Sequence, residues 1–293
     1  MSLAMKIVEN QHSDIIEFID TVFSGHTDLQ SDIKRTLMSH LNKGIFSLQK
    51  NGEIQIVACA FESNWHPVCT YIQVAYDFTC SSKAALHNLL TYLQTHFERP
   101  LMFKIDGRFT QLSSVLIELN YKMIRQTDIC SIDVNTVHVE GKILPDNVLI
   151  LHDLRKIPHL HDQFISLCQD VYTNTHLDNP VADLPISEWT NMIMADVLEE
   201  ISSVLVVEDE VRAFSLMYEG DRTDSWELGW NGVRSKVPPF ILKEMLEHQI
   251  RIGQRHGIHI IEKENDSTDP FSQYVLKDIP HQVSKTLYSY KGR

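Results

Sequence analysis

The sequence predicts a mixed α/β (α+β) protein of two successive modules, each a mixed, mostly antiparallel sheet flanked by helices. Three observations lead to this prediction. Apolar residues recur with helical spacing in some segments and alternate with polar residues in others. The expected strands and helices follow one another in the same order in both halves of the chain, which indicates a repeated unit. The length of 293 residues suits two domains better than one.

The first half is expected to begin with two helices, followed by a hairpin whose turn is marked by Asn51-Gly52. Asn-Gly favours the two-residue turn of an antiparallel hairpin, because both residue types tolerate a positive φ. A strand, a helix, a strand, a helix and a last strand complete the half. These elements are expected over residues 13–23, 29–41, 45–61, 70–76, 81–97, 101–105, 112–119 and 122–134.

The second half repeats this order after an initial strand. Its hairpin is expected to turn near Glu208 to Glu210, and its longest helix is expected to end at Gly257, since glycine is common at helix C-caps. The elements are expected over residues 147–154, 159–172, 186–198, 202–220, 226–233, 238–257, 258–262, 269–278 and 282–292.

A polar stretch between the halves predicts where one module ends. Residues Val137–Asn147 read VHVEGKILPDN and contain a glycine and a proline, which interrupt regular structure. The sequence therefore predicts one module over residues 1–140 and a second over residues 141–293.

Composition excludes several classes of protein. A formal net charge of −13 argues against nucleic-acid binding as the main function, and 43% apolar residues exclude a disordered chain. No apolar run approaches the roughly 20 residues that span a bilayer. Scattered cysteines and histidines without metal-ligand spacing argue against a metal site. We expect a cytoplasmic protein without nucleic-acid, membrane or metal partners. The five cysteines are expected to be reduced, and most of them to fill the core: Cys59, Cys69, Cys80, Cys130 and Cys168.

One junction stands out as a candidate ligand site. Residues 226–246, WELGWNGVRSKVPPFILKEML, predict a strand that turns directly into a helix. A strand that returns through a helix to the next strand pairs with it in parallel, and ligands of open α/β sheets bind where such strands end. The N-terminus of a helix also favours an anion. Here the turn has no glycine, and Pro238 and Pro239 remove two N–H donors while starting the helix well.

This element order and this junction resemble the GNAT N-acetyltransferase superfamily, and the whole chain resembles a tandem of two GNAT modules. WNGV before the helix is similar to the end of the family's fourth strand. IIEKENDSTDPFSQYVLKDI is similar to its strand, Asn, short helix and Tyr, with Asn265 on the Asn and Tyr274 on the Tyr. Asp278-Ile279 stands in place of the family's Gly-Phe. The loop RSKVPPF departs from the family's glycine-rich phosphate loop.

The resemblance implies that the second module binds acetyl-CoA and that the first, which departs further from the motifs, is non-catalytic. Side-chain charge at the loop would replace part of the missing backbone cradle. Backbone N–H groups near the end of the fourth strand would polarise the thioester carbonyl. The candidate cofactor-binding residues are Trp230, Asn231, Gly232, Val233, Arg234, Lys236 and Asn265. For Asn265, a turn-capping role is the open alternative.

Two residues are candidates for catalysis. Glu227 resembles the family's strand-four base, and it lies six residues before Val233, so an unbroken strand would place both side chains on one face. Tyr274 is the candidate acid for the departing thiolate. The structural alternatives are a solvent-facing strand glutamate and a core aromatic residue on a short helix.

The function that the resemblance implies is acetyl-CoA-dependent N-acetyl transfer to an unidentified amine, by direct attack and without a covalent enzyme intermediate. The acceptor would be a small-molecule amine or a peptide. An alternative is a GNAT-like pseudoenzyme that binds a ligand or partner without catalysis, because the loop lacks glycine. A homodimer is also possible, since open sheets leave strand edges that can pair.

Overall fold

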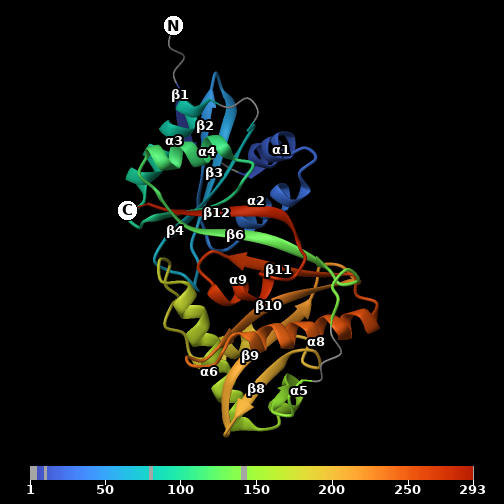
Figure 1. The fold of residues 1–293 in the computed structure, drawn as a ribbon. Coiled ribbons are helices and arrows are strands. Elements are labelled where there is room, and N and C mark those ends of the chain that lie inside the picture. Colours follow the sequence, from blue (N-terminus) through green and yellow to red (C-terminus); the bar gives the residue numbers. More distant parts are fainter. Residues whose placement is uncertain (1–4, 10–11, 79–81, 140–143, 293) are drawn as a thin grey trace. The chain divides into compact units, whose positions relative to one another are not determined.

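The computed structural model describes residues 5–9, 12–78, 82–139 and 144–292 (Figure 1). The chain forms two compact units. Unit 1 comprises Met1–Arg125, Asp178–Ala182 and Leu287–Arg293, and unit 2 comprises Gln126–Leu177 and Asp183–Thr286. Neither unit is one continuous stretch of sequence, because Asp178–Ala182 and the end of β12 (Gln282–Lys291) belong to unit 1. The strand β6 (Lys122–Asp133) also passes from unit 1 into unit 2.

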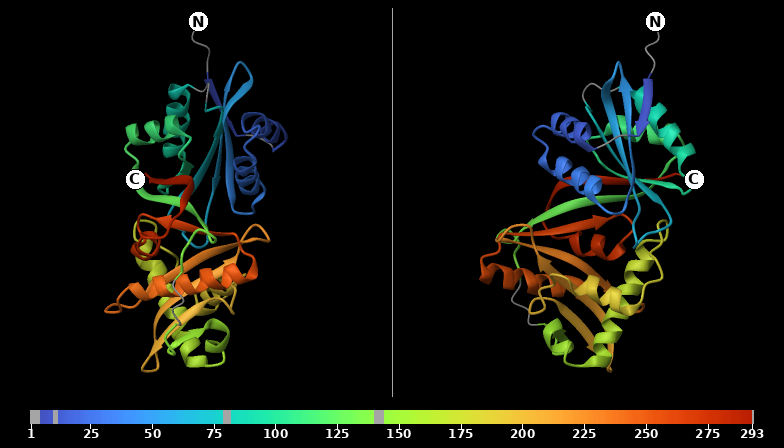
Figure 2. Two further views of the ribbon diagram at one scale, coloured as in Figure 1. Left: turned by 45° about the vertical axis from the view of Figure 1, so that its right-hand side comes forward. Right: turned by 180° about the vertical axis from the view of Figure 1, so that it is seen from behind.

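Unit 1 is a sheet with helices on both of its faces. Its strands follow the order β1-β2-β3-β4-β5-β12, with all neighbours antiparallel except β4 and β5. Figure 2 shows α1 and α2 on one side of the strands and α3 and α4 on the other. The bounds are β1 Met5–Glu9, α1 His12–Val22, α2 Thr27–Met38, β2 Asn42–Lys50, β3 Glu53–Phe61, β4 Thr70–Tyr76, α3 Lys83–His96, β5 Leu101–Asp106 and α4 Thr110–Glu118.

Local sequence explains much of this unit. Asn51 and Gly52 both have positive φ, as the β2–β3 hairpin requires, so the predicted Asn-Gly turn is confirmed. The apolar positions of α1 and α2 that the 3.6-residue period singles out, such as Ile15, Ile19 and Ile33, are buried against the sheet.

Unit 2 follows the same plan. Its strands follow the order β6-β11-β10-β9-β8-β7 and are antiparallel except for β10 and β11. Figure 1 shows the long helices α6 and α8 beside these strands. The bounds are β7 Val148–Ile150, α5 Leu151–Leu154, α6 Pro158–Thr175, α7 Ile186–Met194, β8 Ser203–Val207, β9 Glu210–Glu219, β10 Ser225–Val233, α8 Phe240–His256, β11 Ile260–Asp266 and α9 Pro270–Leu276.

α6 and α8 cover opposite faces of this sheet. On β9, Ser215 donates a 2.9 Å hydrogen bond to Gln249 of α8. On β10, Gly232 lies against Val171 of α6. Gly257 has φ 74° and ends α8 with a bond from its N–H to Gly253, which confirms the predicted C-cap. These two faces are called the α6 face and the α8 face below.

The structure corrects two predicted elements. A strand is expected over 147–154, but β7 has only three residues and the chain then turns into the short helix α5. Leu151 and Leu154 are fully buried one helical turn apart, so packing decides this apolar run in favour of a helix. The strand β1 at Met5–Glu9 is absent from the prediction, and it pairs with β2.

Other predictions concern what the chain buries. Four of the five cysteines are buried as expected, namely Cys59, Cys69, Cys130 and Cys168, whereas Cys80 lies outside the described residues. Among the helices that the structure describes, none has the length and apolar character needed to cross a bilayer. Within the same residues, no group of His, Cys, Asp and Glu side chains is arranged to hold a metal ion.

Candidate functional site

The parallel strands β10 and β11 pair over a short length and then separate. Pairing runs from Ser225 opposite Ile260 to Glu227 opposite Glu262. Beyond this point β10 continues to Val233 with β9 as its partner, and β11 continues with β6. The two strands therefore open a gap toward their carboxyl ends, the position where open α/β sheets bind ligands.

A β-bulge lies where the gap begins. Leu228 pairs with Met217 of β9 but Asn231 pairs with Ser215, so β10 carries one extra residue. Glycine at position 229 leaves room for the ring of Tyr218, which a Cβ here would overlap. The bulge leaves the backbone groups of Gly229 and its neighbour outside the regular ladder, where they can bind another molecule.

The bulge overturns one expectation about side-chain direction. An unbroken strand would place Glu227 and Val233 on one face. Across the ladder, Glu227 faces Tyr218 and Val233 faces Ala213, and these partners are five residues apart on a regular strand. Side chains alternate along a strand, so Glu227 lies on the α6 face and Val233 on the α8 face.

The candidate residues 230–232 divide between the two faces. Trp230 packs on the α6 face, with ring centroids 4.8 Å from Tyr172 and 6.4 Å from Trp189. Asn231 lies opposite Ser215, and therefore on the α8 face. Its side chain is 1% exposed, and neither amide atom has a hydrogen-bond partner among the described residues. Buried amides are normally bonded, so this group has unused capacity for a polar ligand.

A lysine crosses the gap at the bulge. Nζ of Lys263, on β11, donates a 2.7 Å hydrogen bond to the carbonyl oxygen of Gly229. The residue is only 5% exposed. Burial lowers its pKa, and the nearby carboxylates led by Asp269 oppose that shift. No described carboxylate lies within ion-pair distance of this nitrogen, so a buried amine rests on one neutral acceptor.

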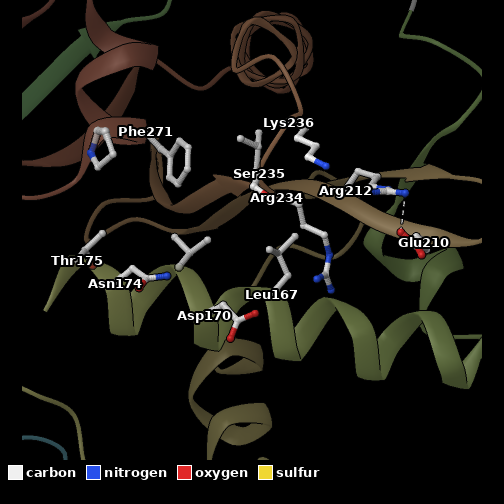
Figure 3. Close-up of a pocket in the computed structure, with 13 residues that line it drawn as sticks. Leu167, Asp170, Asn174, Thr175, Glu210, Arg212, Arg234, Ser235, Lys236 and Phe271 are labelled. Carbon is white, nitrogen blue, oxygen red and sulfur yellow. Dashed lines mark ion pairs between the residues drawn. The ribbon is translucent and has the colours of Figure 1, made fainter. Parts of the chain in front are cut away.

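A cavity of about 630 Å³ lies at the end of β10, beside the start of α9 (Figure 3). Its walls come from α6, the start of β9, the end of β10 with its following loop, and the start of α9. The lining residues are Leu167, Asp170, Val171, Asn174, Thr175, Glu210, Arg212, Val233, Arg234, Ser235, Lys236, Pro270 and Phe271. Three cations and two carboxylates give this wall a net positive character within a chain of charge −13.

The cations of the cavity are held in different ways. Nε of Arg234 donates to the carbonyl oxygen of Val211 at 2.9 Å, which fixes the guanidinium and leaves its other N–H groups toward the cavity (Figure 3). Arg212 forms a 2.6 Å ion pair with Glu210. Lys236 is exposed and has φ 73°, and the Arg234 carbonyl accepts a bond from the N–H of Val237 to close the turn.

Glu227 is a carboxylate with other acids around it. It lies level with Glu262 on the next strand. Desolvation by its surroundings raises the pKa of Glu227, and the charges of Glu264, Glu262 and Asp221 add to the effect while Lys263 opposes it. A raised pKa suits a group that accepts a proton near neutral pH.

Tyr274 lies on α9, and Asn265 lies near the end of β11. The ammonium of Lys243, on α8, lies 5.0 Å from the centroid of the Tyr274 ring and also pairs with Asp278. Asn265 accepts a 3.4 Å hydrogen bond from Ser272 of α9. The N-cap of α9 is another residue, Asp269, whose carboxylate accepts from the N–H of Phe271.

The structure thus brings only part of the expected set together. Val233, Arg234 and Lys236 line the cavity, whereas Glu227, Trp230 and Tyr274 do not. Arg212 and Lys263 are not among the site residues predicted from the sequence. The segment IIEKEND does contain a signal for Lys263. The lysine comes two residues after Ile261, so on a strand it lies on the same, buried side.

The corresponding strands of unit 1 also separate, since β4 and β5 pair only at Thr70–Leu101 and Tyr71–Met102. In unit 1, aromatic side chains pack against one another where the strands end. The centroid of the Phe109 ring lies 5.4 Å from Tyr76 and 5.5 Å from Phe78.

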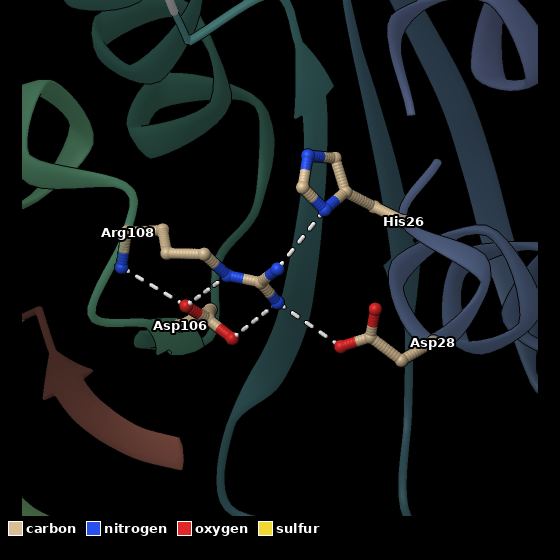
Figure 4. A network of polar contacts seen from close by, with 4 residues as sticks. All are labelled: His26, Asp28, Asp106 and Arg108. Carbon is tan, nitrogen blue, oxygen red and sulfur yellow. Dashed lines mark hydrogen bonds and ion pairs between the residues drawn. The ribbon is translucent and has the colours of Figure 1, made fainter. Parts of the chain in front are cut away.

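A polar network ties the turn after β5 to the start of α2 (Figure 4). Arg108 donates from Nε and Nη2 to the two carboxylate oxygens of Asp106, each at 2.8 Å. The same guanidinium donates to Asp28 at 3.0 Å, and its Nη1 lies 3.1 Å from Nδ1 of His26. The paired carboxylates raise the pKa of Arg108, so the network stays charged.

Comparisons with known proteins rest on structure alone. No protein-family model matches the sequence, and no curated protein is significantly similar to it. Among solved structures, a GCN5-related N-acetyltransferase from Sphaerobacter thermophilus aligns with a TM-score of 0.64 at 12% identity, over 98% of this chain and 95% of that one.

Two further structures support the same fold. A glucosamine N-acetyltransferase region of a fungal multi-domain GH3 β-N-acetylglucosaminidase aligns with a TM-score of 0.67 at 9% identity, over 99% of this chain and 38% of that one. A tandem GNAT protein from the clavulanic acid biosynthesis pathway aligns with a TM-score of 0.55 at 7% identity, over 99% of this chain and 98% of that one. The chain therefore has the fold of the GNAT N-acetyltransferases, in the form that carries two modules.

Proposed function

We propose that the protein is an acetyl-CoA-dependent N-acetyltransferase whose donor site lies in unit 2. The observation that carries this proposal is the gap between β10 and β11, which opens at a bulge, together with the cavity at the end of β10 that three cationic side chains line. The N-terminal module over residues 1–140 has no catalytic role in this proposal, because aromatic rings pack at its equivalent strand ends.

The residues present fit the phosphate groups and the pantetheine arm of acetyl-CoA. Arg212, Arg234 and Lys236 carry the charge that phosphate groups need, and side chains replace the fixed amides that Pro238 and Pro239 cannot supply. In the gap, the unpartnered buried amide of Asn231 offers a donor and an acceptor to the amide groups of a pantetheine arm. Gly232 and Val233 contribute backbone N–H and C=O groups. Asn265 supports α9 by accepting a hydrogen bond from Ser272.

The chain's own groups divide the reaction as follows. Acetyl-CoA supplies an acetyl group on an activated thioester. Backbone N–H groups at the bulge, near Trp230, polarise the thioester carbonyl. Glu227, on the α6 face, takes the proton of the attacking amine, directly or through water, and its acidic surroundings favour a cationic acceptor. Tyr274, on α9, donates a proton to the departing sulfur.

Calorimetric titration of the full chain with acetyl-CoA tests the proposal, with a thermal melt as second readout. Saturable heat and a rise in melting temperature are expected, since a ligand at 100 times its Kd stabilises a protein by about 2.7 kcal/mol. Release of CoA with a panel of small amines and peptides then identifies the acceptor. No heat and no thermal shift at millimolar acetyl-CoA would remove the proposal.

A pseudoenzyme is the second candidate, and two observations favour it. Lys263 already occupies the Gly229 carbonyl across the gap, and the loop after β10 has no glycine. This candidate predicts binding of a ligand or partner without turnover. It also predicts that Glu227→Gln and Tyr274→Phe leave the cellular role intact. A loss of that role in both variants, with folding unchanged, would exclude it.

A further inference from the structure

We propose that Lys263 is the cation that faces the donor's sulfur, so that its ammonium stabilises the departing thiolate of CoA. This inference rests on the proposed function and assigns a role to a residue that the sequence does not mark. Tyr274 remains the proposed proton donor, whereas Lys263 supplies charge without transferring a proton.

Position along the gap is the first argument. The cavity cations lie at and beyond the end of β10, and Arg234 is five residues after Gly229. At about 3.3 Å per strand residue, with one residue taken up by the bulge, these two points are roughly 13–16 Å apart. An extended pantetheine arm is of comparable length. Phosphates held at Arg234 therefore place the sulfur near the bulge, where Nζ of Lys263 lies 2.7 Å from the Gly229 oxygen.

Burial and unused bonding capacity are the second argument. Lys263 is 5% exposed and makes one hydrogen bond among the described residues, to a neutral carbonyl. An ammonium has three N–H donors, so two are available. Leaving a buried charge with one neutral partner costs stability, which an anion at this point would offset. An anion that exists only when the thioester breaks gains most from such a cation.

The third argument is the face of the sheet on which each side chain lies. Lys263 lies two residues after Ile261, whose side chain is buried with the α8 core, so both share the α8 face. Asn231 lies on the same face of β10. Glu227 lies on the α6 face. The arrangement separates a carboxylate that receives the amine's proton from a cation that receives the sulfur's charge, and the acetyl group passes between them.

Several charged or titratable groups surround Lys263 and bear on any pH dependence. Carboxylates act on it from β10, β11 and α9 with its preceding turn, and the thiol of Cys130 lies opposite it on β6. The carboxylates are Glu227, Glu264, Asp266 and Asp269. They favour the charged form of Lys263 and oppose a thiolate, so a lowered thiol pKa in the complex cannot come from them.

Titration of bound CoA tests the proposal without any acceptor. The full chain is saturated with CoA, and thiolate absorbance is followed against pH in ultraviolet difference spectra. Wild type is expected to lower the pKa of the bound thiol by about 1–3 relative to free CoA, as a facing cation does. Desulfo-CoA, which lacks the thiol, provides the matched probe, and the affinity of CoA relative to it should rise with pH.

Variants separate charge from structure. Lys263→Met and Lys263→Gln should both abolish the shift while CoA still binds, and the glutamine variant retains a donor for the Gly229 carbonyl. Lys277→Met removes one exposed charge from the end of α9 in the same unit and should keep the shift. An unshifted thiol pKa in bound wild type, or an equal shift in Lys263→Gln, overturns the inference and leaves the donor site standing. Failure of wild type to bind CoA overturns both.

Discussion

Nζ of Lys263 and the carbonyl oxygen of Gly229, 2.7 Å apart, join two strands that no longer pair with each other. This contact lies at the point where a regular parallel ladder ends and a bulge begins. A buried amine with one neutral acceptor is costly to fold, and the same geometry suits a reaction that creates negative charge nearby.

Stability should depend on pH through Lys263. Its pKa is lowered by burial, so between that value and the ordinary value of about 10.4 the unfolded chain binds more protons than the folded one. The free energy of unfolding of wild type should therefore rise with pH in this window, relative to Lys263→Met. Denaturant unfolding from neutral pH to about pH 10 measures the difference. Lys277→Met serves as the control, and parallel curves for wild type and Lys263→Met would contradict the account.

Glu227→Gln should lower kcat/KM by roughly 10²–10⁴, the usual contribution of a positioned base. Folding stability should hold or rise, because the change removes repulsion from Glu262 and Glu264. The acidic limb of the wild-type rate profile should lie above the ordinary glutamate pKa of about 4.3. Glu262→Gln is the control: it should keep activity and move that limb to lower pH. A Glu227→Gln enzyme with wild-type rates would leave Glu227 as a plain surface residue.

Arg234→Ala should weaken acetyl-CoA binding by roughly 10- to 100-fold, since a hydrogen bond to a charged group is worth about 1.5–3 kcal/mol. The guanidinium is fixed by Val211, so it is well placed for a phosphate. Calorimetry at two salt concentrations measures the loss. Arg222→Ala removes a charge that pairs with Asp224 away from the cavity, and it should bind normally. Equal affinities for both variants would show that phosphates bind elsewhere.

Gly229→Ala should destabilise unit 2 by about 1–3 kcal/mol, the usual cost of overpacking, because the new Cβ would overlap the Tyr218 ring. Tyr218→Leu in the same chain should relieve part of this cost, and a double-mutant cycle of thermal unfolding measures the coupling. The hydroxyl of Tyr218 also donates to Ile193, so the single Tyr218→Leu variant is needed as reference. Additive effects would mean that the bulge relaxes without meeting the ring.

Local patterns carried most of the element prediction. The Asn51-Gly52 turn, the Gly257 cap and the helical period of α1 are decided by neighbours in sequence, and the structure has all three. The run around Leu151 was predicted differently from the structure because an apolar stretch of this length suits either a strand or a helix until its packing is known.

The site was less predictable for a physical reason. A bulge depends on the register of two strands. The faces on which Glu227 and Val233 lie can therefore be assigned only when the pairing of β10 with β9 is known. The role of Lys263 depends on two strands separating, which no residue spacing encodes. Arg212 belongs to β9 and reaches the cavity only through the sheet, whereas Arg234 and Lys236 follow β10 directly and were found from the sequence.

A crystal structure of the full chain with CoA tests the central claim most directly. The account predicts CoA with its phosphates at Arg234 and Lys236, its arm in the gap between β10 and β11, and its sulfur within contact of Lys263. CoA bound elsewhere or not at all, or bound in the gap with its sulfur away from Lys263, would contradict it.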